Sequence, residues 1–216
     1  MHHSIKIRLI AFLFFLIITP IGSLAQLQII PDLETAVWFN SEKLTNPWAG
    51  GFNTPQFSKM DLNKDGVMDL VAFERGFYGS VKCFLNTDSG WKYAPEYHHA
   101  FPEMRNWMLL RDYNCDGLMD IFTSVPGGVS VWQQQTKNDG SFQFVKKENF
   151  LQSTDSDGVD APIYIAVTDI PAIIDMDDDG DLDILSFNLV GSRLEFHRNL
   201  SQELVADCGE LIFEKA

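Results

Sequence analysis

The stretch Asp-Leu-Asn-Lys-Asp-Gly-Val-Met-Asp at residues 61–69 decides the fold, because the same pattern occurs three times in the chain. The second copy is Asp-Tyr-Asn-Cys-Asp-Gly-Leu-Met-Asp at 112–120, and the third is Asp-Met-Asp-Asp-Asp-Gly-Asp-Leu-Asp at 175–183. We call them loop 1, loop 2 and loop 3. Carboxylates or amides at positions 1, 3, 5 and 9 supply hard oxygen ligands, the position 7 carbonyl adds another, and the glycine at position 6 permits a sharp turn. This spacing predicts calcium binding.

The residues that follow each loop exclude an EF-hand. An EF-hand needs a bidentate Glu at position 12 and a helix on each side, but position 12 falls on Ala72, Thr123 and Ser186. Short apolar, β-branched and aromatic runs follow the loops at 70–73, 121–125 and 184–187, and such runs are typical of strands. We therefore expect each ion to lie in a β-hairpin loop.

The repeat extends beyond the loops. Each copy continues with a glycine and an aromatic residue five positions later, at Gly79 and Phe84, Gly127 and Trp132, and Gly191 and Phe196. A second turn and another aromatic strand follow, at 91–93, 142–144 and 211–213, and a further strand leads into each loop, at 56–60, 106–110 and 172–174. Four antiparallel strands per unit predict an all-β fold of three β-propeller blades.

One segment breaks the regularity of the repeat. The first aspartates of successive loops are 51 and then 63 residues apart, and common blades take about 40 to 50 residues. The extra length lies near 152–163, where an acidic stretch runs from Ser153 to Asp160. Its spacing does not match the loop pattern, so we interpret it as a solvated loop, with a fourth, irregular ion site as the alternative.

With this loop between two strands, and with the glycine and aromatic strand that follow, residues 52–216 resemble the FG-GAP/VCBS repeat family, which includes integrin α-subunit propellers and repeats of large secreted bacterial proteins. The resemblance implies a β-propeller with calcium ions bracing hairpins on one face and with ligand recognition in other loops. It implies up to three Ca2+ ions, held by Asp61, Asn63, Asp65, the Val67 carbonyl and Asp69; by Asp112, Asn114, Asp116, the Leu118 carbonyl and Asp120; and by Asp175, Asp177, Asp179, the Asp181 carbonyl and Asp183.

The N-terminus has the pattern of a cleavable secretory signal. Lys6 and Arg8 precede an apolar run from Leu9 to Ile18, and Ser-Leu-Ala at 23–25 provides a processing site. A membrane anchor is the alternative, but the run is shorter than the roughly 20 residues that span a bilayer. We expect a signal peptide at 1–25, no stable membrane insertion, and a secreted or cell-surface protein.

Charge and cysteine content limit the possible partners. Removal of 1–25 changes the net charge from −14 to −16, which argues against nucleic acid and anionic membranes as partners. Twelve of the 30 acidic residues lie inside the three loops, so the charge reflects the calcium sites more than an acidic binding face. Three cysteines, Cys83, Cys115 and Cys208, cannot all pair, and the sequence does not decide whether any two are bridged.

No catalytic constellation is visible in the sequence. It lacks G-x-S-x-G, H-E-x-x-H and a phosphate-binding glycine-rich loop. His98 and His99 read as loop or surface histidines, and His197 alternates with Glu195 and Arg193 as on a solvated strand face. We expect a non-enzymatic module for surface recognition or adhesion that binds an extracellular protein or glycan. A scaffold or accessory module of a secreted carbohydrate-active enzyme is the alternative.

Three blades are too few to close a propeller ring, which has about four to eight. The ring should therefore be open, with the outer faces of the first and third blades bare. A strand expected at 35–40, in the N-terminal segment 26–51, is a possible closing strand for a last blade. Further blades of a longer chain, or self-association, would cover the bare faces.

Overall fold

Strands account for nearly all regular structure in the described part of the chain. The computed structural model describes residues 32–76 and 79–216, of which 36–216 form one unit. Helical structure there is confined to the 3-10 helices η1 (Pro47–Ala49) and η2 (Pro95–Ala100) and to α2 (Ser201–Val205). None of these helices has the length and apolar character needed to cross a membrane. The fold is all-β, as predicted; the expected signal peptide lies outside the described residues.

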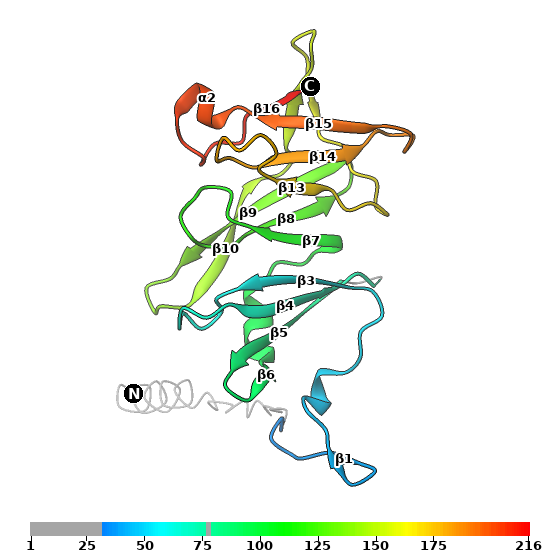
Figure 1. The fold of residues 1–216 in the computed structure, drawn as a ribbon, viewed down its shortest axis with the longest axis vertical. Coiled ribbons are helices and arrows are strands. Elements are labelled where there is room, and N and C mark those ends of the chain that lie inside the picture. The colour runs from blue at the N-terminus through cyan, green and yellow to red at the C-terminus, as the bar shows by residue number, and fades with distance from the viewer. Residues whose placement is uncertain (1–31, 77–78) are drawn as a thin grey trace, which may run out of the picture. The chain divides into compact units, whose positions relative to one another are not determined.

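The first two sheets are four-stranded, antiparallel and blade-like (Figure 1). Their strands pair in chain order, and the expected strands at 56–60 and 106–110 are both present. Each of the first two loops joins the first strand of its sheet to the second, which confirms the predicted hairpin position. The first sheet comprises β3 (Pro55–Met60), β4 (Asp69–Glu74), β5 (Ser80–Thr87) and β6 (Gly90–Tyr93), and the second comprises β7 (Arg105–Arg111), β8 (Asp120–Val125), β9 (Gly128–Thr136) and β10 (Phe142–Glu148).

The third sheet has six strands, in the order β12-β11-β16-β15-β14-β13. Four of them form the third blade, in which loop 3 connects the first strand to the second: β13 (Ala172–Ile174), β14 (Asp183–Phe187), β15 (Leu194–Asn199) and β16 (Phe213–Lys215). The other two are β11 (Gln152–Thr154) and β12 (Asp160–Pro162), a hairpin that pairs β11 in parallel with β16. The interpretation of this segment as a solvated loop is correct for the turn at 155–159, of which 156–159 are exposed, but wrong for the flanking residues, which pair as β11 and β12 with Ser153 buried.

Two apolar cores join the sheets. Val71 and Phe73 on one face of the first sheet pack with Met108 and Ile121 of the second. The opposite face of the second sheet packs on the third, through Trp107, Phe122, Val129, Val131, Ile173, Ile184 and Phe213. Alternation along β4 and β8 places successive residues on opposite faces, so the second sheet uses one face toward the first sheet and the other toward the third.

The outer face of the first sheet is covered, contrary to the prediction. Residues 46–52 lie across it: Ala49 forms a buried cluster with Ala72 and Phe84, and the Phe52 ring contacts Phe84 with centroids 6.1 Å apart. Asn46 fixes this segment, since its Oδ1 accepts a hydrogen bond from the Tyr93 backbone N–H at 2.8 Å. An extra apolar segment thus takes the place that a preceding blade would occupy.

The corresponding prediction for the third sheet is correct. Leu185 and Phe187 of β14 face away from the second sheet, and Leu194 pairs with Phe187. Phe187 is 46% exposed and Leu194 59% exposed, and Ile174 of β13 is exposed as well. The third sheet therefore presents an apolar face that no described segment covers.

Two smaller expectations were wrong. In place of a strand over 35–40, Trp38–Phe39 (β1) pairs with Glu42–Lys43 (β2) in a separate two-stranded sheet, so this segment closes no blade and the described strands form no closed ring. His197 is not on a solvated face: it is 4% exposed, and burial lowers the pKa of its imidazole from 6.5 to about 4. Its face of β15 packs toward the core because its strand partner is Ile184.

Candidate metal centres

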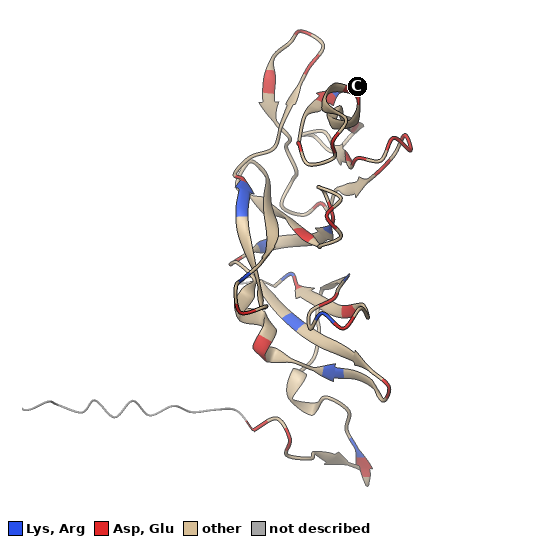
Figure 2. Cartoon of the chain, turned by 90° about the vertical axis from the view of Figure 1, so that its left-hand side faces the viewer, with Lys and Arg blue, Asp and Glu red and all other residues tan. Residues whose placement is uncertain are grey.

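The three loops share one backbone conformation. Position 4 has a positive φ in each loop, at Lys64 (62°), Cys115 (57°) and Asp178 (61°), and so does the glycine at position 6. A left-handed residue two positions before a left-handed glycine coils the chain tightly, and in loops 1 and 2 hydrogen bonds connect position 5 to the side chains at positions 1 and 3. Figure 2 shows acidic residues gathered in loops between the strands.

The carboxylates at positions 1 and 5 are held by the loop's own backbone. Asp61 Oδ2 accepts a hydrogen bond from the Gly66 N–H at 2.9 Å, and Asp65 Oδ1 accepts one from the Val67 N–H at 2.7 Å. The equivalent bonds recur in loop 2, from Gly117 to Asp112 and from Leu118 to Asp116, and in loop 3, from Gly180 to Asp175 and from Asp181 to Asp179. These bonds fix the position of two predicted ligands in each loop without using all their oxygen lone pairs.

The aspartate at position 9 ties each loop to its sheet. Asp69 has no exposed surface; its Oδ2 accepts from the Leu62 N–H at 2.9 Å and its Oδ1 from the Asn86 N–H at 2.8 Å. Asp120 accepts in the same way from Tyr113 and Gln134, and Asp183 from Met176 and Asn199. Each position 9 carboxylate therefore joins the second residue of its loop to the third strand of its blade.

Loop 3 brings three of its predicted ligands together. One oxygen from each of Asp175, Asp177 and Asp183 lies within 4.8 Å of the other two. Asp175 Oδ1 is buried without a hydrogen-bond partner in the described structure, and so is Asp179 Oδ2. Unpartnered carboxylate oxygens turned inward are costly unless a cation lies between them, so this donor set fits a hard divalent ion such as Ca2+.

Loops 1 and 2 differ from loop 3 at position 3, where they carry an amide. The Asn63 and Asn114 amide groups donate to the carboxylates of Asp65 and Asp116, at 2.8 and 3.0 Å. Asn114 Oδ1 is buried and without a partner in the described structure, as expected for an oxygen available to an ion. Each of these loops therefore offers two carboxylates, one amide oxygen and the position 9 aspartate.

Burial raises the pKa of several of these carboxyl groups. Burial disfavours the charged form of Asp120, and the pKa of this carboxyl group is raised to about 7. Repulsion from Asp116 and Asp112 contributes smaller amounts to this rise. The pKa of Asp181 is raised to about 6 by burial and by repulsion from Asp179, Asp183 and Glu203. A bound divalent cation would oppose both effects because it stabilises the ionised form of every carboxylate around it.

Sequence reasoning missed two features beside the loops. Cys115 at position 4 of loop 2 forms a disulfide with Cys208, with 6.1 Å between the Cα atoms, so loop 2 is covalently joined to the segment before β16. Near loop 3, the Arg198 guanidinium forms ion pairs with Asp177, 2.7 Å away, and with Glu203 of α2. Neither pairing was visible in the sequence because the partners come from distant or irregular segments.

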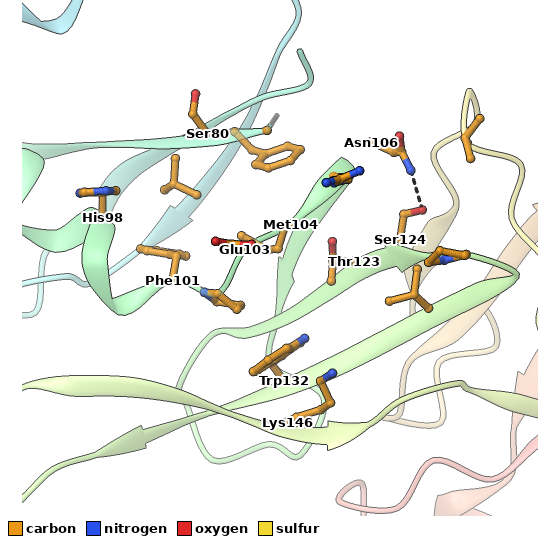
Figure 3. A pocket seen from close by; sticks show the side chains of 18 of the residues that line it. Ser80, His98, Phe101, Glu103, Met104, Asn106, Thr123, Ser124, Trp132 and Lys146 are labelled. Atoms are coloured by element: carbon orange, nitrogen blue, oxygen red, sulfur yellow. Dashed lines mark hydrogen bonds between the residues drawn. The ribbon is translucent and has the colours of Figure 1, made fainter. Parts of the chain in front are cut away.

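A pocket of about 870 Å³ lies between the first and second sheets, at the ends of the strands away from the loops. Figure 3 shows Trp132 and Lys146 on one side of it and His98 and Phe101 on another. The Lys146 ammonium lies 4.7 Å from the Trp132 ring centre, and the Asn106 amide donates to Ser124 Oγ at 3.1 Å. An aromatic wall with charged and amide groups suits a polar ligand with an apolar face.

Comparison with known proteins agrees with the repeat pattern. The model of the FG-GAP-like repeat matches residues 61–123, from the first residue of loop 1 into β8. This part of the chain is similar to an FG-GAP-like repeat. The match begins after β3 and includes loops 1 and 2, and loop 3 repeats the same backbone outside it. Neither the curated proteins nor the solved structures gave a match.

Proposed function

We propose that this chain is a secreted, calcium-binding module of FG-GAP-like blades that acts by binding an extracellular ligand and catalyses no reaction. The observation that carries the proposal is the threefold repetition of one loop geometry, with inward oxygens left unpartnered at ligand positions of loops 2 and 3. Calcium would brace the hairpins, because each loop spans the first two strands of its blade and is bonded to the third.

The pocket between the first two sheets is the proposed recognition site. It lies at the strand ends opposite the loops, so ion binding and ligand binding use different surfaces. Trp132 offers a ring against which the apolar face of a sugar can stack, while Glu103, Arg105 and Asn106 can bond hydroxyl or amide groups. A glycan or a short stretch of an extracellular protein fits this chemistry.

Calcium binding is tested by thermal unfolding of residues 26–216 in excess chelator, in Ca2+ and in Mg2+. Each ion that binds only the folded state adds about 2.7 kcal/mol at a concentration 100 times its Kd, so Ca2+ should raise the melting temperature markedly. Mg2+ should do so less, because it prefers a small octahedral shell with retained waters. Asp179→Ala should weaken the tightest binding more than Asp65→Ala, since loop 3 has the most carboxylates. An unchanged melting temperature in chelator would refute the calcium role.

Ligand recognition is tested by screening the purified module against glycans and matrix proteins. Trp132→Ala should abolish binding of any ligand taken by the pocket. Trp91→Ala is the matched control, because Trp91 is exposed on β6 and does not line the pocket. Equal loss of binding in both variants would place the ligand elsewhere.

The exposed apolar face of the third sheet is the second proposed contact surface. In the first two sheets the equivalent face is buried by the next sheet, as for Val71 and Phe122, whereas Phe187 is exposed. We propose that a further blade or a second copy of the chain covers this face. Sedimentation of the isolated module tests whether a second copy covers this face. We expect it to show self-association.

A further inference from the structure

The surroundings of loop 3 hold more negative charge than one calcium ion can balance. Loop 3 contains six acidic residues, whereas loops 1 and 2 contain three each. Glu203 of α2 adds a seventh carboxylate, and Arg198 forms ion pairs with two members of this group. With every carboxyl group ionised, one Ca2+ and Arg198 together leave a formal charge of −4 here, while one Ca2+ leaves −1 on the acids of each other loop.

A second group of ligand oxygens lies beside the first. Oxygens of Asp177, Asp179 and Glu203 lie within 4.8 Å of one another, as do those of Asp175, Asp177 and Asp183. Asp177 belongs to both groups, and a carboxylate has two oxygens that can each face a different ion. Glu203 lies outside the repeated loop, and loops 1 and 2 have no counterpart among the three-carboxylate groups of the described residues.

A buried carboxylate oxygen beside this second group independently indicates an ion here. Asp181 is 1% exposed, and its Oδ1 has no hydrogen-bond partner among the described residues. Its Oδ2 accepts a hydrogen bond at 3.0 Å from the backbone N–H of Gln202, the neighbour of Glu203, so the carboxylate lies where loop 3 meets α2. Asp179 Oδ2, which belongs to the second group, is also buried and unpartnered. A buried carboxylate oxygen without a hydrogen-bond partner is costly unless a cation lies beside it.

We propose that loop 3 binds two calcium ions, the second held by Asp177, Asp179 and Glu203 beside the buried Asp181 carboxylate, with Asp177 and Asp179 shared between the two ions. This proposal rests on the calcium binding proposed above. Arg198 forms ion pairs with Asp177 and Glu203 when the second ion is absent, so its guanidinium competes with that ion for these two carboxylates. The second ion therefore binds more weakly than the first, and its binding connects loop 3 to α2 and thus to the segment that leads into β16.

The experiment counts Ca2+ ions bound per chain by equilibrium dialysis of residues 26–216. Glu203→Gln should bind one ion fewer than the wild type, and the control Glu210→Gln, an exposed glutamate outside both oxygen groups, should bind the wild-type number. An equal number of ions in Glu203→Gln and the wild type would overturn the second site while leaving the first three standing. A wild type that binds no Ca2+ would overturn the proposed function as well, so the two failures are distinguishable.

Arg198→Gln provides a measurement that does not depend on losing a ligand. Removal of the competing guanidinium should tighten the weakest calcium site by roughly fivefold, the scale of one partly exposed ion pair. An unchanged or weaker affinity of that site would count against the proposal, because it would mean that Arg198 and the ion do not share carboxylates. Circular dichroism of each variant in Ca2+ confirms that the fold is retained.

Discussion

The buried aspartate at position 9 should stabilise its blade even without calcium, unlike the position 5 aspartate of the same loop. Asp69→Ala removes the acceptor of two backbone N–H groups, those of Leu62 and Asn86. Asp65→Ala removes bonds that lie at the exposed surface of loop 1. Both substitutions remove a carboxylate from loop 1, at position 5 and at position 9. The difference between them therefore measures the effect of burying that carboxylate.

The expected magnitudes differ by severalfold. Each buried donor left without a partner costs about 1–3 kcal/mol, so Asp69→Ala should lower the free energy of unfolding in chelator by roughly 2–6 kcal/mol. The exposed bonds of Asp65 can be replaced by water, so Asp65→Ala should cost about 1 kcal/mol or less under the same conditions. In saturating Ca2+ the Asp65 variant should lose about 2.7 kcal/mol more at 100 times Kd, because one ion site is lost.

Urea unfolding of the three proteins, in chelator and in Ca2+, measures these free energies. Asp69→Asn serves as an intermediate variant: it keeps one carbonyl oxygen but turns an NH2 group toward one of the two donors, so it should lose roughly half as much. If Asp69→Ala and Asp65→Ala lose equal stability in chelator, the position 9 carboxylate does not act as a link between loop and sheet, and the reasoning is refuted.

Three further predictions concern other parts of the structure. His197 is neutral when folded, because its pKa is about 4, but the unfolded chain protonates it below 6.5. Stability present above pH 6.5 is therefore lost as pH falls toward 4, so His197→Phe should reduce the loss of unfolding free energy between pH 7 and 5 by roughly 2 kcal/mol, and an unchanged loss would contradict this. Gly79→Ala should destabilise the fold in urea unfolding far more than Gly127→Ala, because its Cβ would lie 2.2 Å from the Met104 carbonyl oxygen while the space beside Gly127 is open; equal losses would contradict this. Phe187→Asp should reduce binding of a hydrophobic dye to the isolated module, and unchanged fluorescence would show that the third sheet is covered.

The loops and strands could be predicted from the sequence because local patterns specify them. Aspartates, asparagines and a glycine at fixed spacing define a turn whose ligands all come from nine consecutive residues. Alternating apolar residues after each turn specify a strand and the faces it presents. The three-residue strand Ala172–Ile174 has the bounds that the sequence predicted, and that prediction used only the position of the strand before loop 3.

What the sequence did not reveal depends on contacts between distant segments. The disulfide between Cys115 and Cys208 joins residues 93 positions apart, and nothing in the spacing of three cysteines favours that pair. The burial of His197 was missed because Arg193 and Glu195 made its side of β15 look solvated, although Ile184 on the neighbouring strand faces the core. The hairpin of β11 and β12 was missed because its parallel partner, β16, is about 60 residues later.

The covering of the first sheet bears on how the exposed third sheet can be used. Head-to-tail addition of copies would require the exposed face of one third sheet to meet the outer face of another copy's first sheet, and such contacts extend without limit unless they close into a ring. Residues 46–52 already cover that outer face, with Phe52 packed on Phe84 and held under the Lys82 ammonium 4.8 Å from its ring centre. The same segment that completes the first blade therefore opposes open-ended stacking, so two copies that associate through Phe187 must do so face to face, as a closed pair.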